Sequence, residues 1–223
     1  RLDNRGPYDL YTNLSEHFKT IEYIAKTGKP LEPNVSHHFA FRGSDDVTYI
    51  VTAYLSAKMA KMLGIKTLVL QNMLNTPRVT WGIQDLAKSR AMLKLIRELE
   101  DADFKVILQP RAGLDYFSPD LNKAKTQLAS VTALMDDIDC YDNTSPQIIH
   151  VVSFSEAFDL ATPEIINESI KITLHSLIKY RQLKKEGKVE DMGRNINVAE
   201  REIELLSSAR AIISIIENNV ENV

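Results

Sequence analysis

The chain has 223 residues, a formal net charge of −3 and 44% hydrophobic residues. This length allows one large domain with a sizeable core, and the composition is that of a globular protein. The charge gives no electrostatic basis for binding nucleic acid or an anionic membrane, and no apolar run approaches the ~20 residues of a membrane span. The single cysteine, Cys140, excludes an internal disulfide and favours a reducing, cytoplasmic location.

The first part of the chain has the pattern of a lead-in. Residues 1–33 carry one predicted helix, over about 15–26, which Gly28 stops and the prolines at 30 and 33 keep from resuming. The chain starts at Arg1 without a methionine, so we weigh a processed or disordered end equally with a segment of a larger protein. Residues 34–223 form the second predicted unit.

Four short apolar runs within 34–223 predict β-strands, and a predicted helix follows each one. The strands are 38–41, 67–70, 104–108 and 148–152. The run 67–70 is β-branched and apolar without alternation, which is typical of a strand buried on both faces. The helices are about 47–62, capped by Ser44 or Asp45, then 83–100, 121–136, one from Thr162-Pro163 to Gly187, and a final helix over 198–219.

Repeated strand–helix units predict right-handed crossovers and a parallel sheet. The predicted fold class is α/β, namely a parallel (β/α) barrel of TIM type with about four strand–helix units, half a barrel or more, plus a C-terminal helix. A full barrel usually needs about 250 residues. The pattern does not separate half a closed barrel from an open, doubly wound sheet.

Polar side chains stand where these strands end, and parallel α/β folds bind ligands at that edge. Arginine grips a carboxylate with two parallel hydrogen bonds, and amides recognise polar groups. The alternative is that strand-to-helix turns are polar in any protein. The predicted substrate-binding residues, for a small carboxylate, are Arg42, Gln71, Asn72, Gln109 and Arg111.

The spacing of residues in the sequence does not indicate a metal site or a known catalytic motif. His37 and His38 lack a carboxylate at metal-ligand spacing, so packing or hydrogen bonding is the favoured role, and His150 reads as a satisfied core histidine. There is no phosphate loop, dinucleotide fingerprint, zinc signature or nucleophile elbow, and no lysine directly follows a strand. No metal site and no catalytic residue is predicted.

The segment from Ser153 to Pro163, Ser-Phe-Ser-Glu-Ala-Phe-Asp-Leu-Ala-Thr-Pro, resembles a known family. It is similar to the last-strand segment of the adenosylcobalamin-dependent carbon-skeleton mutases, in particular the large subunit of glutamate mutase (methylaspartate mutase). The similarity extends in order through the first strand–helix unit, the helix start at 84–87, the turn at Gly113 and the final helix. It matches the C-terminal part of that family's barrel.

The resemblance implies a radical isomerase whose barrel faces a separate cobalamin-binding domain or subunit. In that family a cobalt–carbon bond breaks and an adenosyl radical starts the substrate's rearrangement, while the protein binds, orients and shields. Glu156 matches the glutamate that accepts hydrogen bonds from the ribose hydroxyls, with Ser153 and Ser155 beside it. Val152 stands where glutamate mutase has a lysine, which leaves the substrate open.

The resemblance also implies partners. The cobalt-ligating Asp-x-His-x-x-Gly signature is absent, so the corrinoid would be held on another domain or subunit. The rest of the barrel would come from sequence outside these residues or from a partner chain, in an oligomer. Two alternatives stay open: a different barrel or doubly wound enzyme acting on a small carboxylated metabolite, and a non-catalytic half-barrel that scaffolds an assembly.

Overall fold

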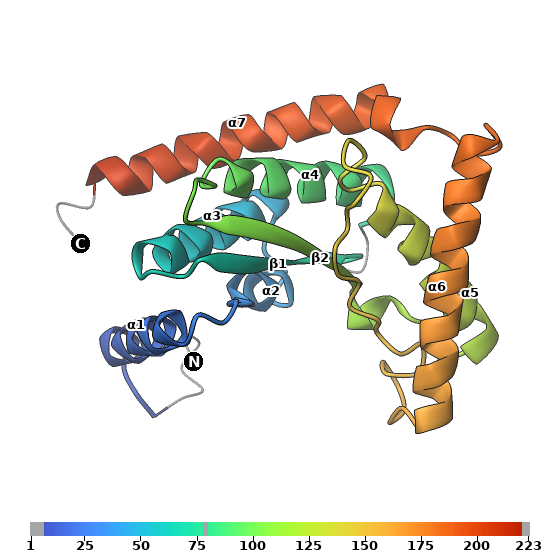
Figure 1. The fold of residues 1–223 in the computed structure, drawn as a ribbon, viewed down its shortest axis with the longest axis horizontal. Coiled ribbons are helices and arrows are strands. Elements are labelled where there is room, and N and C mark those ends of the chain that lie inside the picture. The colour runs from blue at the N-terminus through green and yellow to red at the C-terminus, as the bar shows by residue number, and fades with distance from the viewer. Residues whose placement is uncertain (1–6, 78–79, 220–223) are drawn as a thin grey trace.

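The computed structural model describes residues 7–77 and 80–219 (Figure 1). Helices dominate, and two strands run through the centre of the molecule. In chain order the elements are α1 (Leu10–Thr27), α2 (Val35–Ala40), α3 (Asp46–Met62), β1 (Thr67–Leu74), α4 (Ile83–Arg97), β2 (Lys105–Ala112), the 3-10 turn η1 (Leu114–Tyr116), α5 (Leu121–Asp136), α6 (Pro163–Lys185), the 3-10 turn η2 (Met192–Arg194) and α7 (Ile196–Asn219).

The strands β1 and β2 are parallel, in a register that runs from Thr67 opposite Lys105 to Leu74 opposite Ala112. Single parallel bridges extend this sheet on both sides, from Leu31 to Leu68 and from Arg111 to His150. Four chain segments therefore lie side by side in chain order. The α/β class with a parallel sheet is confirmed, and the regular sheet is smaller than that of a complete barrel.

The first predicted strand is wrong. Residues 38–40 belong to the helix α2, and the segment beside β1 is the one around Leu31. Four apolar residues in a row do not distinguish a strand from one turn of helix. The prolines that flank Leu31 and Glu32 favour a loop prediction, so the sequence pattern does not indicate a strand there. Part of the predicted lead-in, 1–33, thus contributes to the sheet.

Capping residues explain where the helices begin. Asp9 accepts a hydrogen bond from the Thr12 amide at 2.8 Å, so α1 begins five residues before the predicted start of 15. Of the two proposed caps for α3, Asp45 is the one used, again at 2.8 Å from an amide, that of Thr48. Thr162 caps α6 as expected, and α5 has the predicted bounds.

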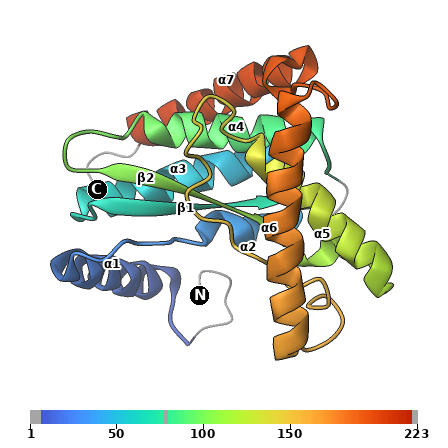
Figure 2. The same cartoon turned by 45° about the vertical axis from the view of Figure 1, so that its right-hand side comes forward.

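Helices cover the two sides of the strands unequally. In the views of Figures 1 and 2, α4 and α7 lie on one side of the strands, and α1 lies on the other. Leu68 and Leu70 belong to the hydrophobic core, while the alternate residues Val69 and Gln71 face away from it. Within the described ranges, no helix is both long and apolar enough to cross a bilayer.

Candidate functional site at the ends of the strands

Two glutamines on neighbouring strands hold one carboxylate. Gln71 of β1 and Gln109 of β2 are opposite each other in the register, and both are buried. The Nε2 group of Gln109 donates to Oε2 of Glu32 at 2.9 Å, and Nε2 of Gln71 donates to Oε1. Glu32 itself is exposed. Two buried amides thus orient an acid at the surface of the sheet.

Two histidines join this group. Nδ1 of His150 lies 3.3 Å from Nε2 of Gln71, and Nε2 of His37 lies 3.2 Å from the Gln71 carbonyl oxygen. Burial, together with the positive charge of Arg111, lowers the pKa of His37 to about 4. Burial and Arg111 also lower the pKa of His150. Both rings are therefore neutral at pH 7.

Arg111 is the cation of this cluster. Its backbone forms the parallel bridge to His150. Its side-chain Nε donates to the Ala112 carbonyl oxygen at 3.2 Å. Among the residues that the structure describes, no carboxylate forms an ion pair with it, although Glu156 and Glu32 attract its charge. Its terminal N–H groups make no recorded hydrogen bond there, so the guanidinium can bind an added carboxylate.

Glu156 lies beside this cluster, at the rim of a cavity of about 680 Å³ that Phe158, Ile166 and Ile170 also line. Its carboxylate is exposed and accepts no recorded hydrogen bond within 7–77 and 80–219. The hydroxyls of Ser153 and Ser155 are buried and lie 3.2 Å apart. Both serines stabilise the turn that presents Glu156, and Ser153 also lines the cavity.

Two of the predicted site residues lie elsewhere. Asn72 points to the opposite face of β1, where its Oδ1 accepts a hydrogen bond from the Ser89 hydroxyl at 2.9 Å. It is fully buried against α4. Arg42 lies in the turn between α2 and α3, and its Nη1 donates to the His38 carbonyl oxygen at 2.6 Å. Because α2 replaces the predicted first strand, Arg42 does not follow a strand.

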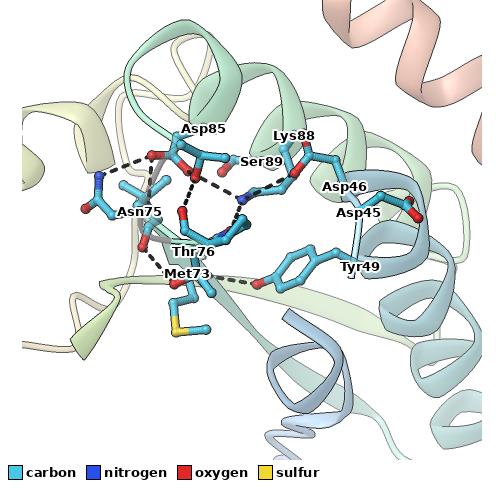
Figure 3. Close-up of polar contacts among 12 residues, drawn as sticks. Asp45, Asp46, Tyr49, Met73, Asn75, Thr76, Asp85, Lys88 and Ser89 are labelled. Atoms are coloured by element: carbon cyan, nitrogen blue, oxygen red, sulfur yellow. Dashed lines mark hydrogen bonds and ion pairs between the residues drawn. The ribbon is translucent and has the colours of Figure 1, made fainter. Parts of the chain in front are cut away.

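A second polar network, drawn in Figure 3, is centred on a buried lysine. The side chain of Lys88, on α4, is fully buried, and its Nζ donates to the Thr76 carbonyl oxygen at 2.6 Å. Nζ also lies 3.4 Å from Oδ1 of Asp85 and 3.7 Å from Oδ1 of Asp46. Asp85 accepts from the Asn75 amide at 2.9 Å, and burial raises its pKa. A lysine ammonium therefore does sit at the end of a strand, supplied by a helix.

Tyr49 connects the two networks. Its ring stacks on His37 with 5.9 Å between centroids, and Nζ of Lys88 lies 5.3 Å from the centre of the same ring. Its hydroxyl accepts from the Met73 amide at 3.1 Å. The Lys88 network thus fixes the carboxyl end of β1, while the half-exposed cluster around Arg111 is the part that a ligand can reach.

The loops that follow β1 and β2 also meet. The Gly113 amide donates to the Leu74 carbonyl oxygen at 2.8 Å, and the rings of Trp81 and Tyr116 stack with 5.4 Å between centroids. These two aromatic side chains therefore join the two loops. Within the described parts of the chain, no three His, Cys, Asp or Glu side chains come close enough to hold a metal ion.

Comparison with known proteins does not identify a family for this chain. No protein-family model matches the sequence, and no curated protein matches it significantly. The class defined by the structure is therefore an α/β protein with a parallel sheet and a polar cluster at the ends of its strands.

Sequence reasoning missed Glu32, which lies at the centre of this cluster. Its neighbours Pro30 and Pro33 made the segment look like a break between elements. The one available signal was the pair Leu31-Glu32 between two prolines, just before a predicted strand–helix unit. His150 was recognised as a strand residue, but its side chain joins the site instead of the core.

Proposed function

We propose that this chain is the C-terminal barrel part of an adenosylcobalamin-dependent carbon-skeleton mutase, an isomerase similar to the large subunit of glutamate mutase. One observation carries the proposal. Glu156, in the segment that resembles the family, presents an exposed carboxylate just after the 148–152 segment, beside the cluster around Arg111, and no hydrogen bond to it is recorded from any described residue. An acceptor for two ribose hydroxyls needs this exposure.

The sheet supports a barrel rather than a doubly wound fold. The four segments around Leu31, β1, β2 and His150 follow one another in chain order, and each is parallel to the next. A doubly wound sheet reverses its strand order at a switch point, whereas a (β/α) barrel keeps chain order throughout. We therefore propose that these segments are about half of a TIM-type barrel.

Each group in the cluster has a role in this proposal. Arg111 binds a carboxylate of the substrate, and Gln71 and Gln109 orient Glu32 and line the same face of the sheet. Glu156 binds the ribose of the adenosyl group, and Ser153 and Ser155 shape its turn. The corrinoid, held mainly by a partner domain or subunit of a cytoplasmic, multi-subunit enzyme, supplies the radical chemistry.

A binding measurement on the native assembly tests the role of Glu156. Calorimetry with 5′-deoxyadenosine and with its 2′-deoxy analogue should show that the assembly prefers the ribose form. The change Glu156→Gln should weaken binding of 5′-deoxyadenosine about tenfold, or ~1.4 kcal/mol, and reduce this preference. The matched control is Glu164→Gln, on the exposed first turn of α6. If Glu156→Gln binds both nucleosides as the unaltered assembly does, the ribose role is refuted.

A second function has one specific observation in its favour. The guanidinium of Arg111, which forms no ion pair with a described residue, lies near a carboxylate that two amides orient, and it can bind a small carboxylated metabolite without any cofactor. A different (β/α)-barrel enzyme would use this site in a self-sufficient fold. Nucleoside binding separates the two functions, because this enzyme would have no site for 5′-deoxyadenosine.

A further inference from the structure

The side-chain amide of Gln71 determines which ring nitrogen of His150 carries a proton. Its Nε2 donates to Oε1 of Glu32 and lies 3.3 Å from Nδ1 of His150. The reverse orientation of this amide would place its carbonyl oxygen against the Glu32 carboxylate, where two acceptors repel each other. Because an amide nitrogen only donates, Nδ1 of His150 must accept. The neutral ring therefore has its proton on Nε2.

The same contact keeps the ring of His150 uncharged. A proton on Nδ1 would point at the N–H groups of the Gln71 amide, which have no lone pair to receive it. Partial burial and the positive charge of Arg111 also lower the pKa of His150, against the opposing charges of Glu32 and Glu156. At pH 7 His150 is thus a neutral ring with one donor, the Nε2–H group.

His150 and Arg111 are neighbours on one face of the sheet. They form a parallel bridge, so their side chains leave the backbone on the same side of two segments about 4.8 Å apart. Both side chains are half-buried. In the described parts of the chain, no hydrogen bond is recorded for Nε2 of His150 or for the terminal N–H groups of Arg111. Two donor side chains, one neutral and one cationic, are therefore adjacent and able to bind an added acceptor.

We propose that the Nε2–H group of His150 donates to the same ligand carboxylate that Arg111 binds, which makes His150 a specificity-determining residue of this site. The two oxygens of a carboxylate have about four lone-pair directions, enough to accept from both side chains. Glu32 is not this carboxylate, because the amides of Gln71 and Gln109 hold its two oxygens. A protonated histidine would repel Arg111, whereas a neutral ring adds a hydrogen bond without that repulsion.

This role of His150 rests on one part of the proposed function, namely the carboxylate bound by Arg111. The alternative barrel enzyme would bind such a carboxylate as well. The ribose role of Glu156 is independent of it, so separate measurements can decide the two.

Nitrogen NMR of the native assembly tests the protonation state of the ring. With isotope-labelled histidine in this chain, His150 should show a protonated Nε2 and an unprotonated Nδ1 at pH 7. Its signals are assigned by their absence from the His150→Gln variant. Propionate, a small carboxylate probe, should shift the Nε2 signal, whereas propionamide, its uncharged analogue, should not.

Two substitutions separate the donor role from the contact with Gln71, and NMR titration observed on propionate gives their dissociation constants. His150→Asn keeps an acceptor near the position of Nδ1 and loses the Nε2 donor, so propionate should bind about tenfold more weakly. His150→Gln places an amide N–H near the position of Nε2, so binding should stay within about threefold of the unaltered assembly. A purely structural role through Gln71 predicts the reverse order. The control His17→Asn, exposed on α1, should leave propionate binding unchanged.

Several results would overturn the role of His150. These are a proton on Nδ1, unchanged propionate binding in His150→Asn, an equal loss in His150→Gln, and no binding of propionate to the unaltered assembly. All of them leave the ribose role of Glu156 standing, because binding of 5′-deoxyadenosine is measured separately. Conversely, absence of nucleoside binding together with the expected propionate series would refute the mutase and retain the role of His150.

Discussion

Gln109 donates a 2.9 Å hydrogen bond to Glu32, although the two residues are 77 positions apart in the chain. The bond spans β1, because Gln71 lies between them and donates to the same carboxylate. One acid therefore ties the first segment of the sheet to the third. This arrangement places the negative charge of Glu32 near Arg111. Burial lowers the pKa of Arg111, whereas the charges of Glu156 and Glu32 raise it.

Removing this acid should loosen the sheet. Glu32→Ala leaves the buried amides of Gln71 and Gln109 without their acceptor, so the free energy of unfolding should fall by about 1–2 kcal/mol. Urea denaturation measures this change. The control Glu16→Ala removes an exposed acid that pairs with Lys19 on α1, and it should change stability by less than about 0.5 kcal/mol. Equal losses in both variants would show that Glu32 has no special role.

The buried pair of Lys88 and Asp85 should show strong coupling. Lys88→Met leaves a fully buried carboxylate without its cation, and Asp85→Asn leaves the ammonium without its closest anion, so each should cost roughly 3–5 kcal/mol. The double variant should cost less than the sum of the two. Denaturation of all four proteins completes the cycle. Additive losses would mean that the two charges do not depend on each other.

His37 should make stability depend on pH. Its pKa in the folded protein is about 4, below the ordinary value of 6.5. Between these two pH values the unfolded chain binds a proton on His37 and the native state does not. Stability from this group is therefore complete above about pH 6.5 and is lost as pH falls towards 4, by roughly 3 kcal/mol at most. Urea denaturation at several pH values should show a smaller slope for His37→Gln. The control His17→Gln, exposed on α1, should keep the original slope.

Gly113 should not tolerate a side chain. A Cβ there would lie 2.4 Å from the Thr76 hydroxyl oxygen and 3.0 Å from the carbonyl oxygens of Leu74 and Asn75. Because backbone atoms cannot move aside cheaply, Gly113→Ala should cost about 1–3 kcal/mol and disturb the loops after both strands. Thermal denaturation and the fluorescence of Trp81 would report the two effects. An unchanged melting temperature would contradict the close approach.

The parts of the fold that follow from local chemistry were predictable. Thr162-Pro163 has a cap and a first-turn proline in sequence, and α6 begins there. The strand at 67–70 is apolar on both faces, and β1 contains it. The part of the sheet that was not predicted depends on tertiary contacts. The segment at Leu31 becomes part of the sheet only because β1 offers it partners, and no local pattern marks it.

The candidate site, too, was predictable where it follows from local sequence and not where it depends on tertiary contacts. Gln71, Gln109 and Arg111 were predicted from their places at the strand ends, and the structure brings them to one face. Asn72 was grouped with Gln71, but successive strand residues point to opposite faces, and the pattern did not decide which of the two faces α4. Lys88 could not be found from strand ends, because a helix supplies it from twelve residues beyond Thr76.

The most direct test of the central claim is the visible absorption spectrum of the native assembly, isolated through a tag on this chain. If the chain is the barrel part of an adenosylcobalamin-dependent mutase, a partner domain or subunit should carry a corrinoid, or should bind added adenosylcobalamin with the corrinoid's absorption bands. An assembly that has no corrinoid bands and does not bind adenosylcobalamin would contradict the claim.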